Sequence, residues 1–319
     1  MFFTVYWTHV CGIAREMVGD VTSNPQNRPW SVDKGHSFWG NAFRQILHDR
    51  LSVAAAIALI ALTVLCIVGP PVAERELHVD VERTNVRERY QPPSYEHPFG
   101  TDHLGRDLLI RLLFGGRISL AVAYSASTLS MTIGLVIGVM AGYYGGRIDD
   151  FIMWLITTLS SIPALFLLLV ATAIWSPSPV VLIFFLAALG WIETARLIRG
   201  QTISLKHKEY LVAARAVGCT DLRLMMQYIL PNVLSIAIIS MTISAGALIL
   251  LESGLSFLGL GVRPPTPTWG NMLTESRAYF DKGIHLVIFP GVAITVTVLC
   301  FFLLGDGLRD ALDPRQTYR

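Results

Sequence analysis

The chain has 319 residues, of which 53% are hydrophobic and only 15% are charged. Soluble globular domains carry about 25% charged residues, so this composition, together with apolar runs of about 20 residues, indicates a helical membrane protein. The formal net charge of +2 and the lack of a basic stripe argue against a nucleic-acid partner. The four cysteines, Cys11, Cys66, Cys219 and Cys300, form no CxxC pair, which argues against a disulfide framework or a zinc site.

The region before the first apolar run has two parts. Residues 1–35 form an N-terminal extension, which we expect in the cytoplasm and to which the sequence assigns no function; it lacks the pattern of a cleaved signal peptide. Residues 36–50 place apolar side chains on one helical face and basic side chains elsewhere, which predicts an amphipathic elbow helix in the membrane interface. A frayed start of the first span is the alternative. The apolar face comprises Trp39, Phe43, Ile46 and Leu47.

The apolar runs predict an all-α integral membrane fold. Each run is long enough to cross a hydrocarbon layer of about 30 Å, and Pro163 predicts a kink inside the third. Gly134 and Gly138 form a GxxxG pattern, a weak signal for close helix contact. An even number of spans and the excess of Lys and Arg on one side predict that both termini are cytoplasmic. The six predicted spans cover residues 51–73, 117–142, 150–174, 179–198, 229–251 and 284–305.

The external loop over residues 74–116 contains a group of metal-ligating residue types. His97, Asp102, His103 and Asp107 could form a metal site, but ligand-rich loops are common and Asp102 also suits a helix N-cap. Leucines on one face of the following segment favour a surface-lying helix packed on the membrane boundary. We therefore expect a structural loop with a surface helix and no metal.

Catalytic motifs are absent from the sequence. It contains no G-x-x-x-x-G-K-[ST], no GxSxG and no HExxH pattern. The charged residues inside the spans are few, and Glu193, Arg196 and Glu252 are expected to be interfacial anchors or interhelical partners. The sequence predicts a chain that is not an enzyme and that holds no cofactor or metal of its own.

A charged stretch at residues 208–232 lies between two apolar runs and reads as helix, turn, helix. We expect one helix over residues 207–217, ended by Gly218 in a left-handed conformation, and a second helix capped by Thr220 or Asp221 and running to Pro231. Small side chains before the glycine would allow close approach of a partner. An ordinary loop folded on its own bundle is the alternative. The small residues are Ala213, Ala214 and Ala216.

This stretch resembles the "EAA" coupling loop of binding-protein-dependent ABC importer permeases. The pattern maps onto Ala213–Ala214, Gly218 and Leu230–Pro231 with both spacings kept. Val212 stands where that family has Glu, and Tyr228 where it has Ile. Glu209, three residues before Val212, could supply the missing acidic group from nearly the same helix face.

Four further segments resemble the dipeptide/oligopeptide/nickel permease subfamily, in order and with natural spacing. They cover most of residues 97–314 and follow the pattern of the "C" permease, the partner of a longer "B" permease. The segments are "HPFGTDHLGRDLLIRLLFGGRISL", "GWIETARLIRGQ", "LLESGLSFLGLGVRPPTPTWGNML" and "LLGDGLRDALDP".

The resemblance implies a type I ABC importer permease fold in the bacterial inner membrane. The core domain would cover residues 117–314, with a coupling loop at 199–228, an external scoop at 252–283 and a cytoplasmic tail at 315–319. The implied partners are a second, "B"-type permease, two cytoplasmic ATPases that hold ATP and magnesium, and an extracytoplasmic solute-binding protein. ATPase coupling is implied for Glu209, Ala213, Ala214, Gly218, Asp221, Leu230 and Pro231, and contact with the binding protein for Glu252, Ser256, Phe257, Pro264, Pro265 and Trp269.

Peptides are the substrate that the resemblance favours. Nickel, glutathione, haem and sugars are carried by similar permeases, and specificity would lie largely in the binding protein. A secondary transporter and a non-transporting membrane scaffold are the alternatives of a different class. The sequence shows neither an internal repeat nor a coupling-ion site, which a secondary transporter would need.

Overall fold

A computed structural model describes residues 38–76, 84–176, 178–279 and 281–312. Contacts divide the chain into residues 1–41 and residues 42–319, and the description below concerns the second unit. The predicted N-terminal extension and C-terminal tail lie outside the described residues. Within them, regular structure is helical apart from one isolated β-bridge between Thr101 and Asp107, which confirms the predicted all-α class.

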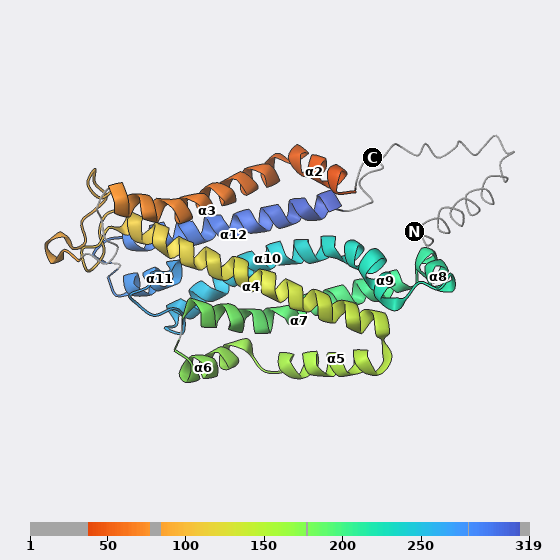
Figure 1. Cartoon of the computed structure of the whole chain (residues 1–319). Helices are drawn as coiled ribbons and strands as arrows, with labels where there is room; N and C mark the ends of the chain where they lie inside the picture. Colours follow the sequence, from red (N-terminus) through yellow and green to blue (C-terminus); the bar gives the residue numbers. More distant parts are fainter. Residues whose placement is uncertain (1–37, 77–83, 177, 280, 313–319) are drawn as a thin grey trace. The chain divides into compact units, whose positions relative to one another are not determined.

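Five helical segments are long and apolar enough to cross a membrane, and a bent pair of shorter helices supplies a sixth span if it is counted as one (Figure 1). The five are α3, α4, α7, the continuous α9–α10 segment and α12, and the bent pair is α5 and α6. In chain order the helices are α2 (Phe38–His48), α3 (Arg50–Glu76), a 3₁₀ turn (Val86–Glu88), α4 (Leu108–Tyr144), α5 (Gly146–Ser160), α6 (Ala164–Ile174), α7 (Pro179–Lys206), α8 (Glu209–Ala216), α9 (Asp221–Leu224), a π-helical turn (Met225–Ile229), α10 (Leu230–Phe257), α11 (Trp269–Arg277) and α12 (His285–Leu312).

Helix α4 is one uninterrupted helix, so the separate surface-lying helix predicted before residue 117 is wrong. The reason lies in Gly115 and Gly116, which remain helical because the bundle packs closely on them. A Cβ atom on Gly116 would lie 2.5 Å from the Cys66 sulfur and 2.7 Å from the Trp269 ring. Leu108 is buried in the protein core and does not lie on a membrane surface.

The third predicted span is broken at Pro163. Helix α5 ends at Ser160, α6 begins at Ala164, and the two axes differ by 74°. Proline has no N–H to donate to the preceding turn, and its ring clashes with the carbonyl four residues earlier, so α5 cannot continue through it. The interruption is a full break, larger than the predicted kink.

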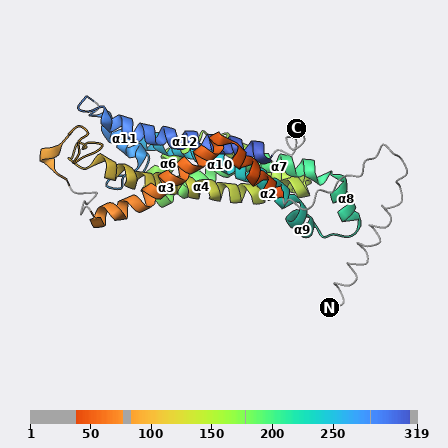
Figure 2. The ribbon, with the colours of Figure 1, turned by 90° about the horizontal axis from the view of Figure 1, so that it is seen from above.

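Helix α4 packs closely against α7 over much of its length. Seen from above, the long helices run in nearly the same direction (Figure 2). Gly134, Gly138 and Gly142 recur at every fourth residue of α4 and face α7. A Cβ atom on Gly138 would lie 2.7 Å from the carbonyl oxygen of Ala195 and 2.8 Å from the Ile198 Cβ. The GxxxG pattern therefore marks a real backbone-to-backbone contact, as packing in membranes favours.

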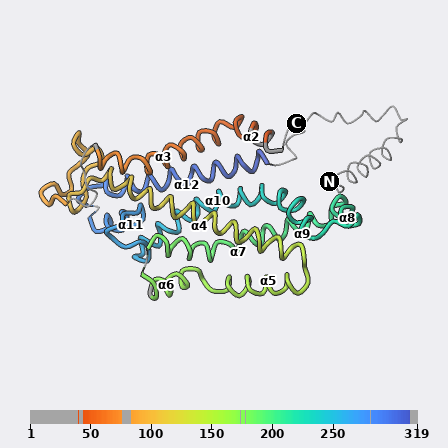
Figure 3. Tube along the Cα trace, viewed as in Figure 1, coloured from red at the N-terminus to blue at the C-terminus, as the bar shows by residue number. Residues whose placement is uncertain are grey.

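The long helices run between two ends with different structures (Figure 3). Helices α8 and α9 lie at one end, here called the hinge end, beside the end of α4 and the start of α10. Residues 84–107 and α11 lie at the other, here called the loop end, where α11 packs against α4, α10 and α12.

Candidate functional site

The hinge end carries the predicted helix–glycine–helix, which covers residues 209–224 and is here called the hinge. Helix α8 covers Glu209–Ala216, slightly shorter than predicted, and Gly218 has φ +90° with no atom within 4 Å of the position of a Cβ. The amides of Gly218 and Cys219 donate to the carbonyls of Arg215 and Ala214, at 3.0 and 3.1 Å, and so close the C-terminus of α8. The left-handed glycine is present as predicted, and it is required by the turn itself and not by neighbouring atoms.

A polar group that the sequence analysis did not identify fastens the hinge to α4. The Tyr143 hydroxyl donates to Asp221 Oδ1 at 2.5 Å and accepts from Arg215 Nη2 at 2.7 Å. The Arg215 guanidinium also lies over the Tyr143 ring, 5.3 Å from its centroid. Lys206 Nζ donates to the Tyr143 carbonyl at 3.1 Å. The opposite charges of Arg215 and Asp221 on either side of the turn could have indicated an ion pair. Their shared partner Tyr143 could not be predicted, because it is far away in sequence.

Apolar side chains beneath this group join the hinge to three long helices. Leu211 of α8 and Leu224 of α9 are buried, and so is Ile229 in the π-helical turn. They belong to one core cluster with Val139 of α4 and Ile198 of α7. Because packed interiors transmit displacement, a force on α8 reaches α4, α7 and α10 directly.

The outer face of the hinge is apolar and exposed. It comprises Val212, Val217 and Leu222, whose exposed fractions are 56%, 78% and 67%. Glu209 and Ala213 are also exposed, but Ala214 is half-buried and packs on the inner cluster. Ala214 is thus turned partly toward the bundle, and ATPase coupling through Glu209, Ala213 and Ala214 stays a prediction.

Pro231 does not interrupt the helical segment. Leu230 donates across a wide turn to the Met225 carbonyl, and the π-helical turn merges into α10 without a break. A wide turn just before Pro231 accommodates a residue that cannot donate a backbone hydrogen bond. At the start of α9 the Thr220 side chain makes no capping bond, and Asp221 bonds Tyr143 and Arg215 instead.

At the loop end, three residues predicted to contact a binding protein are buried within the chain. Glu252, Ser256 and Trp269 are at most 3% exposed. Glu252 accepts from Ser256 at 2.8 Å and from Ser119 at 3.3 Å. The Trp269 indole donates to the Leu112 carbonyl at 2.9 Å. These residues hold α4, α10 and α11 together, and the prediction of direct partner contact is wrong for them.

The other predicted contacts at this end lie on the surface. Pro264 and Pro265 are exposed in the segment between α10 and α11. Phe257 is 42% exposed, and the Arg277 guanidinium lies 5.4 Å from its ring centroid.

An ion network fixes the 97–107 loop on α11. Asp102 Oδ2 accepts from Arg106 at 2.7 Å and from Arg111 at 2.5 Å, and Glu275 accepts from Arg111 at 2.8 Å. Ligand atoms of Asp102, His103 and Glu275 lie within 4.8 Å of one another, but both carboxylates already bind arginines. The electropositive guanidinium groups at both carboxylates oppose a cation, and the bonds present here are those of an ion network.

His97 and Asp107 are placed apart from that network. His97 Nδ1 lies 2.9 Å from Asp107 Oδ2, and Asp107 accepts from the Ile110 amide at 3.1 Å as the N-cap of α4. The N-cap predicted for Asp102 is therefore wrong by five residues. Asp102 instead accepts from the backbone amides of Leu104 and Arg106 inside the loop.

We expect Asp102→Asn to lower the free energy of unfolding by about 3 kcal/mol, because it leaves Arg111 buried without its nearest counter-charge. Burial alone would raise the pKa of Asp102, but the charges of Arg111 and Arg106 and two backbone amides outweigh it and lower the pKa below 3.8. Because the pKa of Asp102 is lower in the folded state, its ionised carboxylate stabilises the fold at pH values above the unfolded-state pKa. This stabilisation is lost as the pH falls through the folded-state pKa. The difference in thermal unfolding between the wild-type transporter and Asp102→Asn should therefore be present at pH 7 and diminish as the pH falls through the folded-state pKa of Asp102.

Asp281→Asn is the matched control, because the Asp281–Lys282 pair is exposed at both side chains. Equal thermal stability of the two variants would show that the buried network does not support the loop.

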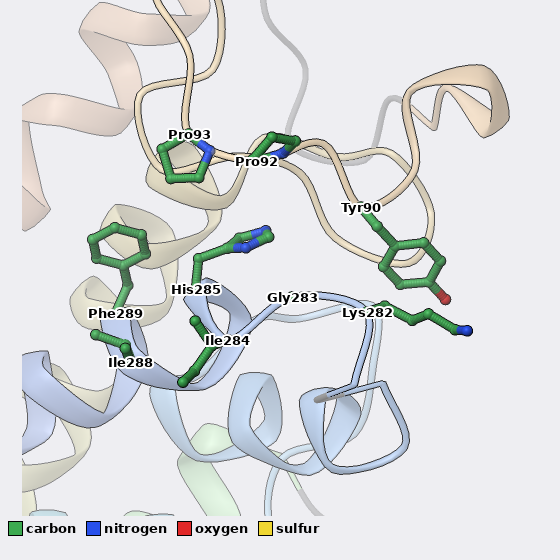
Figure 4. A pocket seen from close by; sticks show the side chains of 9 residues that line it. All are labelled: Tyr90, Pro92, Pro93, Lys282, Gly283, Ile284, His285, Ile288 and Phe289. Atoms are coloured by element: carbon green, nitrogen blue, oxygen red, sulfur yellow. The ribbon is translucent and has the colours of Figure 1, made fainter.

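A cavity of about 520 Å³ opens beside this loop, lined by prolines, aromatic residues and the start of α12 (Figure 4). Its wall is held by Phe99 and Phe289, whose rings stack with centroids 4.0 Å apart. Among the described residues that line it, the titratable side chains are Tyr90, Lys282 and His285. These do not form the paired acid and base that general acid–base catalysis uses.

Comparison with known proteins gives two family matches. Residues 134–318 match the family described as "Binding-protein-dependent transport system inner membrane component". Residues 37–93 match the "N-terminal TM domain of oligopeptide transport permease C". The first match spans more than half of the chain and includes the whole hinge.

Individual relatives are similar over nearly their full length. The chain is 37% identical to the oligopeptide transport system permease protein OppC of Haemophilus influenzae, covering 89% of this chain and 90% of that protein. It is 37% identical to the dipeptide transport system permease protein DppC of Alkalihalophilus pseudofirmus, with 87% and 90% covered. It is 38% identical to the glutathione transport system permease protein GsiD of an Escherichia coli O6 strain, with 90% and 91% covered.

The structure and the comparisons agree on one class of protein. Five helical segments are long and apolar enough to cross a membrane, and residues 209–224 form a helix, a left-handed glycine and a second helix. The chain therefore belongs to the family of inner membrane components of binding-protein-dependent transport systems, the permeases of ABC importers.

Proposed function

We propose that the chain forms one half of the transmembrane pathway of an ATP-driven importer of di- or oligopeptides. The observation that carries this proposal is the hinge at Glu209–Leu224, which is anchored on the bundle and offers an apolar outer face to a second protein. Similarity to permeases named for oligopeptide and dipeptide transport supports the substrate class. A second, homologous permease supplies the other half of the pathway.

The hinge couples the pathway to ATP. Two cytoplasmic ATPase subunits hold ATP and magnesium, since this sequence has no phosphate-binding loop. The hinge binds in a groove of one ATPase through Val212 of α8, Val217 at the end of α8 and Leu222 of α9. When the ATPases close, α8 moves with them, and the bonds of Tyr143 carry that movement into α4. Rigid helices joined in this way switch the pathway between inward- and outward-facing states.

The loop end receives the solute. On this proposal the hinge end and both termini lie in the cytoplasm, and an extracytoplasmic binding protein docks over residues 252–283. Phe257, Pro264 and Pro265 are exposed there and serve as its contacts. The buried Glu252 and Trp269 keep that surface in shape.

Glutathione is a second candidate cargo, favoured by the similarity to GsiD permeases. It is itself a small peptide with an unusual linkage. Competition between unlabelled glutathione and a labelled dipeptide for uptake would separate the two cargoes.

The test is ATP-dependent uptake of a labelled peptide by liposomes that contain the complete complex with its binding protein. We expect uptake with the wild-type chain and a fall of about tenfold with Gly218→Val, because a β-branched residue at positive φ costs about 1–2 kcal/mol and shifts α8. Gly218→Asn is the matched control, since asparagine tolerates positive φ, and it should retain most of the uptake.

Uptake without ATP, or no peptide uptake by a fully assembled complex, would contradict the proposed function. Full uptake by Gly218→Val would contradict the role of the hinge alone.

A further inference from the structure

Helix α7 exposes a carboxylate inside a predicted membrane span. The Glu193 side chain is 81% exposed, and Glu193 is the 15th of the 28 residues of α7. The helix is about 42 Å long, so Glu193 lies inside a hydrocarbon layer of about 30 Å wherever the excess length is placed. A charged group on a lipid-facing surface at this depth is costly, and such residues face a water-filled cavity or a protein neighbour.

A helix break lies at the same depth and touches the same group. Arg196 forms an ion pair with Glu193 at 3.3 Å and donates to the Ser160 hydroxyl at 2.7 Å. Ser160 is the last residue of α5, and the non-helical residues 161–163 that follow are exposed. Irregular backbone at membrane depth occurs only where protein covers it or where it lines a cavity that holds water. Two independent features therefore require water or protein at this place.

The face of α7 that carries Glu193 continues into a groove. Leu197 and Gln201, one and two turns further along, line a hollow of about 500 Å³ that α10 and α12 complete. Ser240 and Ser244 of α10 line it, and neither hydroxyl bonds a side chain or carbonyl of the described residues. Nearby Thr242, by contrast, donates to the Ile238 carbonyl at 3.0 Å. The groove therefore presents free hydroxyl and amide groups on an apolar wall, and Arg309 of α12 lies at its edge.

Stabilisation of helix α7 does not explain why an exposed carboxylate lies at position 193. The ion pair of Glu193 with Arg196 is exposed, and such pairs three residues apart stabilise a helix by only about 0.2–0.5 kcal/mol. The electrostatic link between α7 and α5 is made elsewhere: both Asp149 oxygens accept from Arg199, at 2.5 and 2.6 Å. This bidentate pair does not involve Glu193, and within the described residues the Oε2 atom of Glu193 has no bonding partner.

We propose that Glu193 faces the solute pathway of the assembled transporter and binds the ammonium group of the passing peptide. The proposal rests on the proposed function. An ammonium donates hydrogen bonds to a carboxylate, and in the pathway it competes with Arg196 for Glu193. The groove beyond, toward the hinge end, receives the peptide backbone through Gln201, Ser240 and Ser244, whose groups match amide N–H and C=O.

The first test measures the maximal uptake rate of an amino-terminated dipeptide at saturating loaded binding protein. Glu193→Gln keeps the shape and removes the charge, and a lost charge-assisted hydrogen bond corresponds to a fall of roughly tenfold. We expect that fall in the maximal uptake rate. Phe184→Leu is the control, because Phe184 is exposed nine residues away, about 180° around α7. Wild-type uptake by Glu193→Gln would overturn the proposal.

The second test asks whether position 193 meets water, and it needs no transport. In a background in which Cys11, Cys66, Cys219 and Cys300 are serines, Glu193→Cys and Phe184→Cys are treated with a charged, membrane-impermeant thiol reagent in the assembled complex. We expect modification at 193, slowed by saturating dipeptide, and none at 184. No modification at 193, with or without ATP, would mean that lipid or the second permease covers it and would overturn the proposal. Failure of the wild-type complex to take up peptide would instead remove the proposed function.

Discussion

Replacing Gly138 with leucine is expected to prevent α4 from packing on α7, so that no folded complex is recovered from the membrane. A Cβ atom at this position already lies 2.7 Å from the Ala195 carbonyl oxygen, and backbone cannot move aside as a flexible side chain can. Extra atoms in a packed core typically cost about 1–3 kcal/mol, and a leucine here adds four carbons where the α4 and α7 backbones pack directly on each other. Recovery of monodisperse complex by size-exclusion chromatography measures the effect.

Gly138→Ala should give a graded loss of thermal stability, and Gly291→Ala is the control. Gly291 lies in α12 with no atom within 4 Å of its Cβ position, so alanine there gains about 1 kcal/mol of helix propensity. Equal stability of Gly138→Ala and Gly291→Ala would show that the α4–α7 contact is looser than described.

A single carboxylate on the hinge should separate the chain from its ATPases. Val217→Asp places a charge on the most exposed apolar residue of the hinge, and burying it unpaired in a partner groove costs about 2 kcal/mol or more. The expected result is roughly a 30-fold weaker association, seen as loss of the ATPases on affinity purification, while the second permease stays bound.

The same substitution at the other end provides the control. Val86 is 60% exposed in the 3₁₀ turn at the loop end, and Val86→Asp should retain the ATPases. ATPases retained equally by both variants would mean that another surface holds them, and the proposed seat of α8 would be lost.

The proposed function gives one chain two roles, coupling to the ATPases and conduction of the peptide. The surface proposed to meet the ATPases is apolar and lies at the hinge end, whereas the polar groups proposed to meet the peptide lie along α7 and α10. Both are anchored in the same cluster around Ile198 and Val233. A push on α8 therefore need not cross a flexible joint before it reaches the helices that line the groove.

Features that depend on local chemistry could be predicted from the sequence alone. Apolar runs of sufficient length specify membrane helices whatever their neighbours are, which is why the all-α class was predicted correctly. Gly218 could be placed at a positive φ because a helix end needs a residue without a Cβ. Pro163 marked an interruption for a similarly local reason, although the break is larger than predicted.

Which faces are buried and which distant residues are in contact depends on the tertiary packing and could not be predicted. Ala213 and Ala214 are chemically alike and adjacent, yet one is exposed and the other packs inward. Glu252 and Trp269 sit in a segment that suggests a partner surface, but they bond to α4 across about 130 and 150 residues of chain. Such contacts depend on how helices far apart in sequence pack together, and no local propensity encodes that packing.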